Sequence, residues 1–200
     1  MVKVLAIPGS LREHSLNRRV LNVAVDGARR AGADVTLIDL CDYPMPIYNA
    51  DDHAKGFDPN ASRLQELFNS HHGFLIATPE YNGSFPGGLK NAIDWVSRQS
   101  DKFGRNEVFL GKCAAMITAS PGSFGGIRCL AHLRGVLSIL GLNVLPSEIA
   151  VTFADKKFDG NSAEMTDPKM KAILEDLGAA LVEMLKKTHG DIEFVTDTSS

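Results

Sequence analysis

The chain has 200 residues, of which 44% are apolar, and it carries a formal net charge of −3 at pH 7. This apolar content can form the core of one globular domain, and its even distribution favours one domain over two. The weak negative charge excludes a basic surface for nucleic acid, and no apolar run is long enough for a secretion signal or a membrane span, so we expect a cytoplasmic protein whose partners include neither nucleic acid nor a membrane.

The stretch from Val4 to Arg19 predicts a strand, a loop and the first turns of a helix. Val4 to Ile7 is a short apolar run typical of a buried strand, and Pro8-Gly9 ends it. Because a helix N-terminus has unpaired N–H groups and a partial positive charge, polar residues delivered there indicate an anion site, most simply for phosphate. A polar turn that only caps the helix is an equally compatible alternative. The loop brings these small donors and one guanidinium to the helix: Ser10, Arg12, Ser15 and Asn17.

Residues 33–40 predict a second strand because they are rich in β-branched side chains. Residues 41–62 contain three prolines and little periodicity, which is typical of a long functional or mobile loop. Within this loop, Tyr48 either packs on the surface or forms a wall of a binding cleft. A short helix over residues 63–69 follows.

An apolar run over residues 73–78 predicts the third strand, and two histidines, His71 and His72, precede it. Paired histidines can ligate a metal, but no carboxylate or cysteine lies at ligand spacing from them. We therefore interpret them as part of a solvated turn.

The stretch from Pro79 to Trp95 predicts a second binding loop followed by a helix. Its glycines allow the backbone to approach a flat ligand, its prolines stiffen the loop, and Tyr81 offers a ring for stacking. Leu89, Ile93 and Val96 then repeat at helical spacing. We expect this loop to lie beside the first one.

The second half of the chain continues the alternation of strands and helices. The helix at 127–140 has apolar residues on more than one face, so we expect it to be buried on two sides. We expect residues 1–189 to form one domain and residues 190–200 to be disordered. The remaining elements are a strand, a loop of small residues, a helix, a strand, an amphipathic helix and a polar tail, at residues 112–118, 120–126, 127–140, 142–151, 170–185 and 190–200.

Three cysteines, Cys41, Cys113 and Cys129, lie far apart without a C-x-x-C motif. Such spacing is typical of reduced thiols inside a cell and not of disulfides. We interpret all three as small packing residues.

Five strands that alternate with helices predict a doubly wound α/β fold, with a parallel sheet of order 2-1-3-4-5 covered on both faces. Ligands of such folds bind at the carboxyl ends of the strands, where the loops after strands one, three and four meet. No G-x-G-x-x-G motif follows the first strand, so a mononucleotide phosphate is favoured over a dinucleotide. A Cys-x5-Arg phosphate loop is also absent, which excludes that type of phosphatase.

Two motifs give the chain a family resemblance. The first is Gly9-Ser10-Leu11-Arg12 with Ser15 and Asn17, and the second, which is long enough to be highly specific, runs from Pro79-Glu80-Tyr81-Asn82 to Trp95. They resemble the NADPH-dependent FMN reductase family, and within it the bacterial quinone and chromate reductases. The resemblance extends from about Val2 to Val151 and implies a flavodoxin-like three-layer sandwich that binds FMN.

The resemblance also implies which residues bind the cofactor. Because the flavin carries the chemistry, we expect no catalytic side chain and no metal, and Glu80, although a candidate general base, suits an orienting or structural role at least as well. The FMN phosphate is expected on Ser10, Leu11, Arg12, Ser15, Leu16 and Asn17. The isoalloxazine ring is expected against Pro79, Glu80, Tyr81, Asn82 and Gly83, with Ser120 near the flavin edge.

The implied activity is electron transfer from NADPH or NADH through bound FMN to quinones or similar small molecules, with chromate and other metal oxyanions as further acceptors. A homodimer or homotetramer is the implied assembly.

Two other functional classes stay open. A flavodoxin-type electron carrier would bind FMN without turning over nicotinamide, although such carriers are typically far more acidic than −3. A flavin-free interaction module on the same fold would not need three matched loops of small residues.

Overall fold

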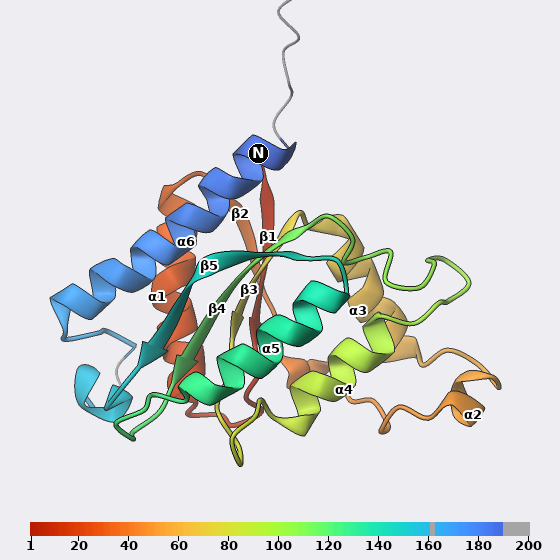
Figure 1. The fold of residues 1–200 in the computed structure, drawn as a ribbon, viewed down its shortest axis with the longest axis horizontal. Helices are drawn as coiled ribbons and strands as arrows, with labels where there is room; N and C mark the ends of the chain where they lie inside the picture. Colours follow the sequence, from red (N-terminus) through yellow and green to blue (C-terminus); the bar gives the residue numbers. More distant parts are fainter. Residues whose placement is uncertain (161–162, 190–200) are drawn as a thin grey trace, which may run out of the picture.

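Five parallel strands form one central sheet in a computed structural model that describes residues 1–160 and 163–189 (Figure 1). Across the sheet the strands run in the order β2-β1-β3-β4-β5, which confirms the predicted doubly wound fold. All four neighbouring pairs are parallel, so the carboxyl ends of the strands lie at one edge. The strand bounds are Lys3–Pro8 for β1, Asp34–Leu37 for β2, Gly73–Ala77 for β3, Cys113–Ala119 for β4 and Asn143–Val151 for β5.

Helices cover both faces of this sheet (Figure 1). The first face carries α1 (Leu16–Arg30) and α6 (Pro168–His189), and the second carries α3 (Pro59–Ser70), α4 (Gly87–Val96) and α5 (Ile127–Ile139). Each face has its own core because successive strand side chains point to opposite sides: Val4 and Ala6 belong to the first core, Leu5 and Ile7 to the second. Among the helices that the structure describes, none is both long and apolar enough to cross a membrane.

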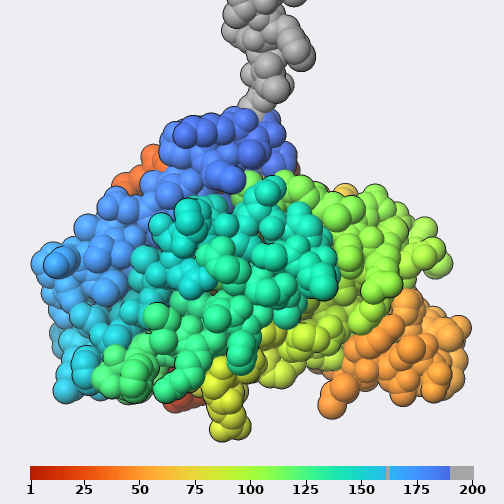
Figure 2. All heavy atoms as spheres, in the orientation of Figure 1, coloured from red at the N-terminus to blue at the C-terminus, as the bar shows by residue number. Residues whose placement is uncertain are grey.

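Helix α5 departs from its prediction. Leu130, Leu133 and Leu137 are buried against the sheet, but Ala131 is exposed and Ile139 is 82% exposed. The helix, coloured teal, forms part of the molecular surface (Figure 2). The expectation that α5 is buried on two sides is therefore wrong for the single chain, in which one stripe of leucines makes the contact with the sheet.

Residues 41–62 are fastened to α4 instead of standing free. They include the one-turn helix α2 (Ala50–His53), and the carbonyl oxygen of Pro46 accepts hydrogen bonds from Trp95 Nε1 (2.8 Å) and Asn91 Nδ2 (2.9 Å). The Tyr48 ring packs edge-on against Trp95 with centroids 5.1 Å apart. Of the two roles considered for Tyr48, the structure supports surface packing.

Helices α1 and α6 approach each other through two glycines. A Cβ atom added to Gly178 would lie 2.0 Å from the carbonyl oxygen of Ala24, and one added to Gly27 would lie 2.1 Å from the carbonyl oxygen of Glu175. The two backbones are therefore in direct contact where the helices cross.

The two histidines before β3 are not in a solvated turn, so that interpretation is wrong. His71 is only 6% exposed, with Nδ1 2.6 Å from the carbonyl oxygen of Leu67 and Nε2 2.9 Å from Thr36 Oγ1. His72 accepts the main-chain N–H of Lys3 at Nδ1 (2.8 Å). His71 therefore joins the end of α3 to the edge strand β2, and His72 joins the start of β3 to its neighbour β1.

This arrangement predicts a loss of stability in mild acid. Burial lowers the pKa of His71 and of His72 below the ordinary value of 6.5, so the folded chain binds protons less readily than the unfolded chain. The stabilisation is complete above that ordinary value and is lost as the pH falls through the lowered pKa of the folded state. We expect the free energy of unfolding in urea to drop as the pH falls below the ordinary histidine value of 6.5. The drop should be smaller in His71→Gln, which does not titrate, and equal drops would contradict the assignment.

Candidate functional site

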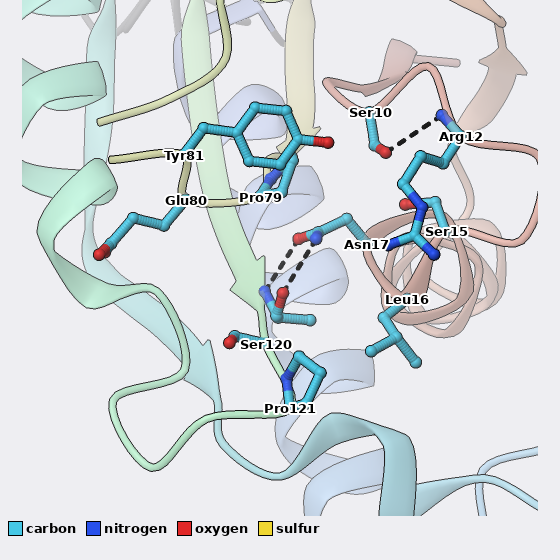
Figure 3. A pocket seen from close by; sticks show the side chains of 11 residues that line it. Ser10, Arg12, Ser15, Leu16, Asn17, Pro79, Glu80, Tyr81, Ser120 and Pro121 are labelled. Carbon is cyan, nitrogen blue, oxygen red and sulfur yellow. Dashed lines mark hydrogen bonds between the residues drawn. The ribbon is translucent and has the colours of Figure 1, made fainter. Parts of the chain in front are cut away.

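A cavity of about 140 Å³ opens at the carboxyl edge of the sheet, between the loops that follow β1, β3 and β4 (Figure 3). Two lining residues, Ala119 and Pro121, were not predicted, because neither has a side-chain hydrogen-bond donor or an aromatic ring, although both lie at the end of a predicted strand. Three predicted residues, Leu11, Asn82 and Gly83, are not in the lining. The other nine predicted residues are: Ser10, Arg12, Ser15, Leu16, Asn17, Pro79, Glu80, Tyr81 and Ser120.

The loop after β1 places two buried serines at the start of α1. The backbone at Gly9 is tightly packed, because a Cβ atom there would lie 2.8 Å from Leu89 Cδ2 and 3.0 Å from Thr78 Oγ1, and the chain then turns to the cavity. Ser10 Oγ accepts the N–H of Arg12 (3.3 Å), and Ser15, the N-cap of α1, accepts the N–H of Arg18 (3.4 Å). The two hydroxyl oxygens thus act as acceptors toward the backbone, and their O–H hydrogens remain available to a ligand.

Asn17 ties the first turn of α1 to the end of β4. Its side chain is 3% exposed, Nδ2 donates to the carbonyl oxygen of Ala119 (3.0 Å), and Oδ1 accepts the N–H of Ala119 (2.8 Å), as the two dashed lines in Figure 3 show. The amide that looked like a phosphate donor is therefore engaged with the main chain. It fixes the distance between two walls of the cavity.

Arg12 is the one cationic residue among the described residues that line the cavity. Its guanidinium extends over Ser15 at the cavity (Figure 3). It forms no ion pair with any acidic side chain in the part of the chain that the structure describes, whereas Arg18 pairs with Asp39. Arg12 is therefore available to a bound anion.

The loop after β3 contains a tight hairpin at residues 81–84. Tyr81 and Ser84 exchange main-chain hydrogen bonds of 2.8 and 3.1 Å. The two residues between them, Asn82 and Gly83, have φ angles of 51° and 81°, the positive pair required by a type I′ turn. The segment, yellow in Figure 2, projects from the lower edge of the molecule. Tyr81 is 49% exposed and offers its ring beside the cavity.

Glu80, just before this hairpin, points away from the cavity (Figure 3). Its Oε2 accepts the main-chain N–H groups of Arg128 (3.0 Å) and Cys129 (3.3 Å), and its Oε1 accepts from the guanidinium of Arg128 (2.8 Å). The carboxylate thus engages the N-terminus of α5.

The loop after β4 meets the segment after β5, for which no function was predicted. Main-chain N–H groups of Phe153 and Ala154 donate to the carbonyl oxygens of Gly122 (3.3 Å) and Ser120 (3.0 Å). Gly126 has a φ of 90°, and a Cβ atom there would lie 2.5 Å from Thr118 Oγ1, so only glycine fits. Residues beyond β5 therefore support the cavity without lining it.

The thiols give no nucleophile at this site. Burial raises the pKa of Cys129 to about 11, and Cys113 is buried as well. Cys41 is exposed, with Sγ 3.5 Å from the carbonyl oxygen of Leu11, so its interpretation as a packing residue is wrong. Across residues 1–160 and 163–189, no group of three or more His, Cys, Asp or Glu side chains could hold a metal ion.

Comparisons with known proteins agree on one family. Residues 2–156 match the sequence model of the family described as NADPH-dependent FMN reductase. The chain is 38% identical to an NAD(P)H-dependent FMN reductase of Pseudomonas aeruginosa, over 89% of this chain and 92% of that protein. It is 36% identical to a quinone reductase of Escherichia coli K12, over 83% and 86%. The solved structure of a flavoenzyme NAD(P)H:(acceptor) oxidoreductase from Paracoccus denitrificans superposes with a TM-score of 0.80 at 30% identity, covering 94% of this chain and 99% of that one.

Proposed function

The chain belongs to the NADPH-dependent FMN reductase family, and on this premise we propose that the cavity is the FMN site of an NAD(P)H-dependent quinone reductase. The protein is an FMN-dependent oxidoreductase that passes electrons from NADPH or NADH to a quinone or a similar small molecule. Hydride acceptance and electron transfer are the chemistry that FMN supplies when bound, so the chain needs neither a nucleophile nor a metal. The observation that carries the proposal is the convergence of three loops from separate strands on one cavity.

The residues at the start of α1 fit a flavin phosphate. Ser10 and Ser15 keep their O–H hydrogens for an anion, and the 15-residue helix α1 directs its unpaired N–H groups to the same place. Arg12 adds a full positive charge. Phosphate binding therefore falls to hydroxyls, backbone and one guanidinium, while Asn17 holds the helix in place.

The hairpin at residues 81–84 fits the ring end of the cofactor. Tyr81 supplies an aromatic face, and the main chain of Asn82 and Gly83 can approach a flat ring because the turn carries few side-chain atoms. Pro79 and Ser120 border the same space. These residues orient the flavin and exclude water from one of its faces.

The function is tested by looking for the flavin. The purified protein should show a flavin absorption band, lose it on anaerobic addition of NADPH or NADH, and regain it with a quinone. A band that nicotinamide does not bleach would favour the electron carrier. A colourless protein that takes up no added FMN would favour the flavin-free module and overturn the proposal.

Replacing Arg12 tests the phosphate end of the site. A hydrogen bond to a charged group is worth about 1.5 to 3 kcal/mol, so Arg12→Ala should weaken FMN binding roughly ten- to a hundredfold. Riboflavin, which lacks the phosphate, should bind wild type and variant alike. Arg105→Ala, which removes an exposed arginine outside the cavity, is the matched control. Unchanged FMN affinity in Arg12→Ala would refute the assignment.

Several features stay predictions. A homodimer or homotetramer, and chromate or other oxyanions as acceptors, are expected from the family resemblance. A cytoplasmic location is expected from the sequence pattern. The assignment of residues 1–189 to one FMN-binding domain also stays a prediction. Residues 190–200, the predicted tail, lie outside the described residues.

A further inference from the structure

We propose that Glu80 is a positioning residue that holds the hairpin at residues 81–84 against the flavin by capping α5, and that it is not itself a ligand of the cofactor. The inference rests on the proposed FMN site and assigns a function to a side chain that the family resemblance placed among the binding residues. Three observations carry it: the missing cap of α5, the three hydrogen bonds of Glu80, and a second link between the hairpin and α5.

Helix α5 has no cap of its own. Its N-cap residue is Gly126, which has no side chain and adopts a left-handed conformation. The first N–H groups of a helix need acceptors, and an acidic group there also interacts favourably with the helix dipole. Glu80 supplies the acceptor and the negative charge: its carboxylate accepts the N–H groups of Arg128, 48 residues later in the chain, and of Cys129.

The carboxylate is fully engaged in this contact. One oxygen accepts two main-chain N–H groups, the other accepts from the Arg128 guanidinium, and the Glu80 side chain is 13% exposed. Arg128 in turn lies over the ring of Phe124, with its guanidinium carbon 4.9 Å from the ring centroid. A carboxylate held in this way is directed at the helix and points away from the cavity (Figure 3).

A second link fastens the far end of the same hairpin. His132, one turn after Arg128, lies with Nδ1 3.0 Å from Ser84 Oγ. Glu80 stands before the hairpin and Ser84 closes it, so both ends are attached to α5. The turn geometry of Asn82 and Gly83 then sets the position of everything between them, including Tyr81.

Removal of the Glu80 tether should loosen the ring end of the site and leave the phosphate end intact. In Glu80→Ala, the affinities for FMN and for riboflavin should fall by the same factor, roughly five- to tenfold. Arg12→Ala should instead weaken FMN alone. An equal fall in affinity for FMN and for riboflavin therefore identifies the hairpin as the affected part of the site.

The conservative variant separates positioning from charge. Glu80→Gln keeps one oxygen that can accept both N–H groups of α5, so it should recover most of the flavin affinity lost in Glu80→Ala. The flavin reduction potential and the pH profile of kcat should follow the wild type in Glu80→Gln. If Gln is as damaging as Ala, or if the potential or the profile shifts, Glu80 acts through its charge and the proposal is wrong.

The second tether provides an independent measurement. Because Glu80 and His132 hold the same hairpin, the losses of riboflavin affinity in Glu80→Ala and His132→Ala should be non-additive in the double variant. If Glu80→Ala does not fold, His132→Ala is the test variant, and its affinities for FMN and for riboflavin should both fall, by a smaller factor. Wild-type protein that binds no FMN would overturn the proposed function, whereas wild-type affinity in both single variants would overturn only the role of Glu80.

Discussion

Gly178→Ala should destabilise the fold by about 3 kcal/mol or more, close to or beyond the upper end of the usual cost of overpacking. The new methyl group would lie 2.0 Å from the carbonyl oxygen of Ala24 and 2.9 Å from the nitrogen of Ala28, whereas ordinary contact begins near 3.4 Å. Both atoms belong to the backbone of α1, so no side-chain rotation relieves the clash, and the two helices must move apart. For a chain of this size the loss corresponds to a fall in Tm of roughly 10 °C.

A second helical glycine gives the matched control. Gly135 lies in the exposed part of α5, and a Cβ atom there would meet nothing within 4 Å. Since Ala favours a helix over Gly by about 1 kcal/mol, Gly135→Ala should raise stability while Gly178→Ala lowers it. Thermal melts of the two variants should shift in opposite directions. Equal shifts would show that α1 and α6 can separate at little cost.

Asn17→Ala should lower both stability and flavin affinity. It leaves the N–H and the C=O of Ala119 buried without their partners, and each such group costs about 1 to 3 kcal/mol. A total loss of roughly 2 to 6 kcal/mol should appear in urea unfolding of the flavin-free protein. Because the N-terminus of α1 is then no longer held beside β4, FMN affinity should fall at least as far as in Arg12→Ala.

The stability of the flavin-free protein shows whether Asn17 holds α1 to β4 or only binds the phosphate. If Asn17 only contacted the phosphate, Asn17→Ala would weaken FMN binding and leave the unfolding curve of the flavin-free protein unchanged. Asn143→Ala is the comparison, since it removes an exposed side-chain bond to the carbonyl oxygen of Gly111 (3.1 Å). Asn143→Ala should lower the free energy of unfolding by about 1 kcal/mol at most.

Much of the fold could be predicted because its signals are local. The three central strands β1, β3 and β4 are short apolar runs. The alternation of strands and helices leaves few ways to build a parallel sheet. The error at α5 has a physical cause: periodicity reports which positions are apolar, and Ile139 is apolar yet 82% exposed in the single chain. The prediction for His71 and His72 was wrong for the opposite reason: polar residues can be buried when partners distant in sequence form hydrogen bonds with them.

At the site, the loops could be predicted but the contacts inside them could not. Asn17 read equally well as a phosphate donor or a cap, and only the structure shows its bonds to Ala119, which lies 102 residues away. Glu80 finds its partners 48 residues away, at a helix whose missing cap is visible only once Gly126 is placed. Gly135 and Gly178 both stand inside helical patterns, and nothing local to either indicates which one touches another backbone.

The contact between α1 and α6 also constrains how the protein is made. The two helices cover the same face of the sheet, yet α1 is the first helix in the chain and α6 is the last. At translation rates of about 5 to 20 residues per second, the ribosome needs roughly 7 to 28 s to pass from the end of α1 to the start of α6. During that time the strands β1, β3 and β4 can pair, but the part of their first face that α6 covers stays exposed. Chaperone capture of the nascent chain should therefore persist until α6 emerges.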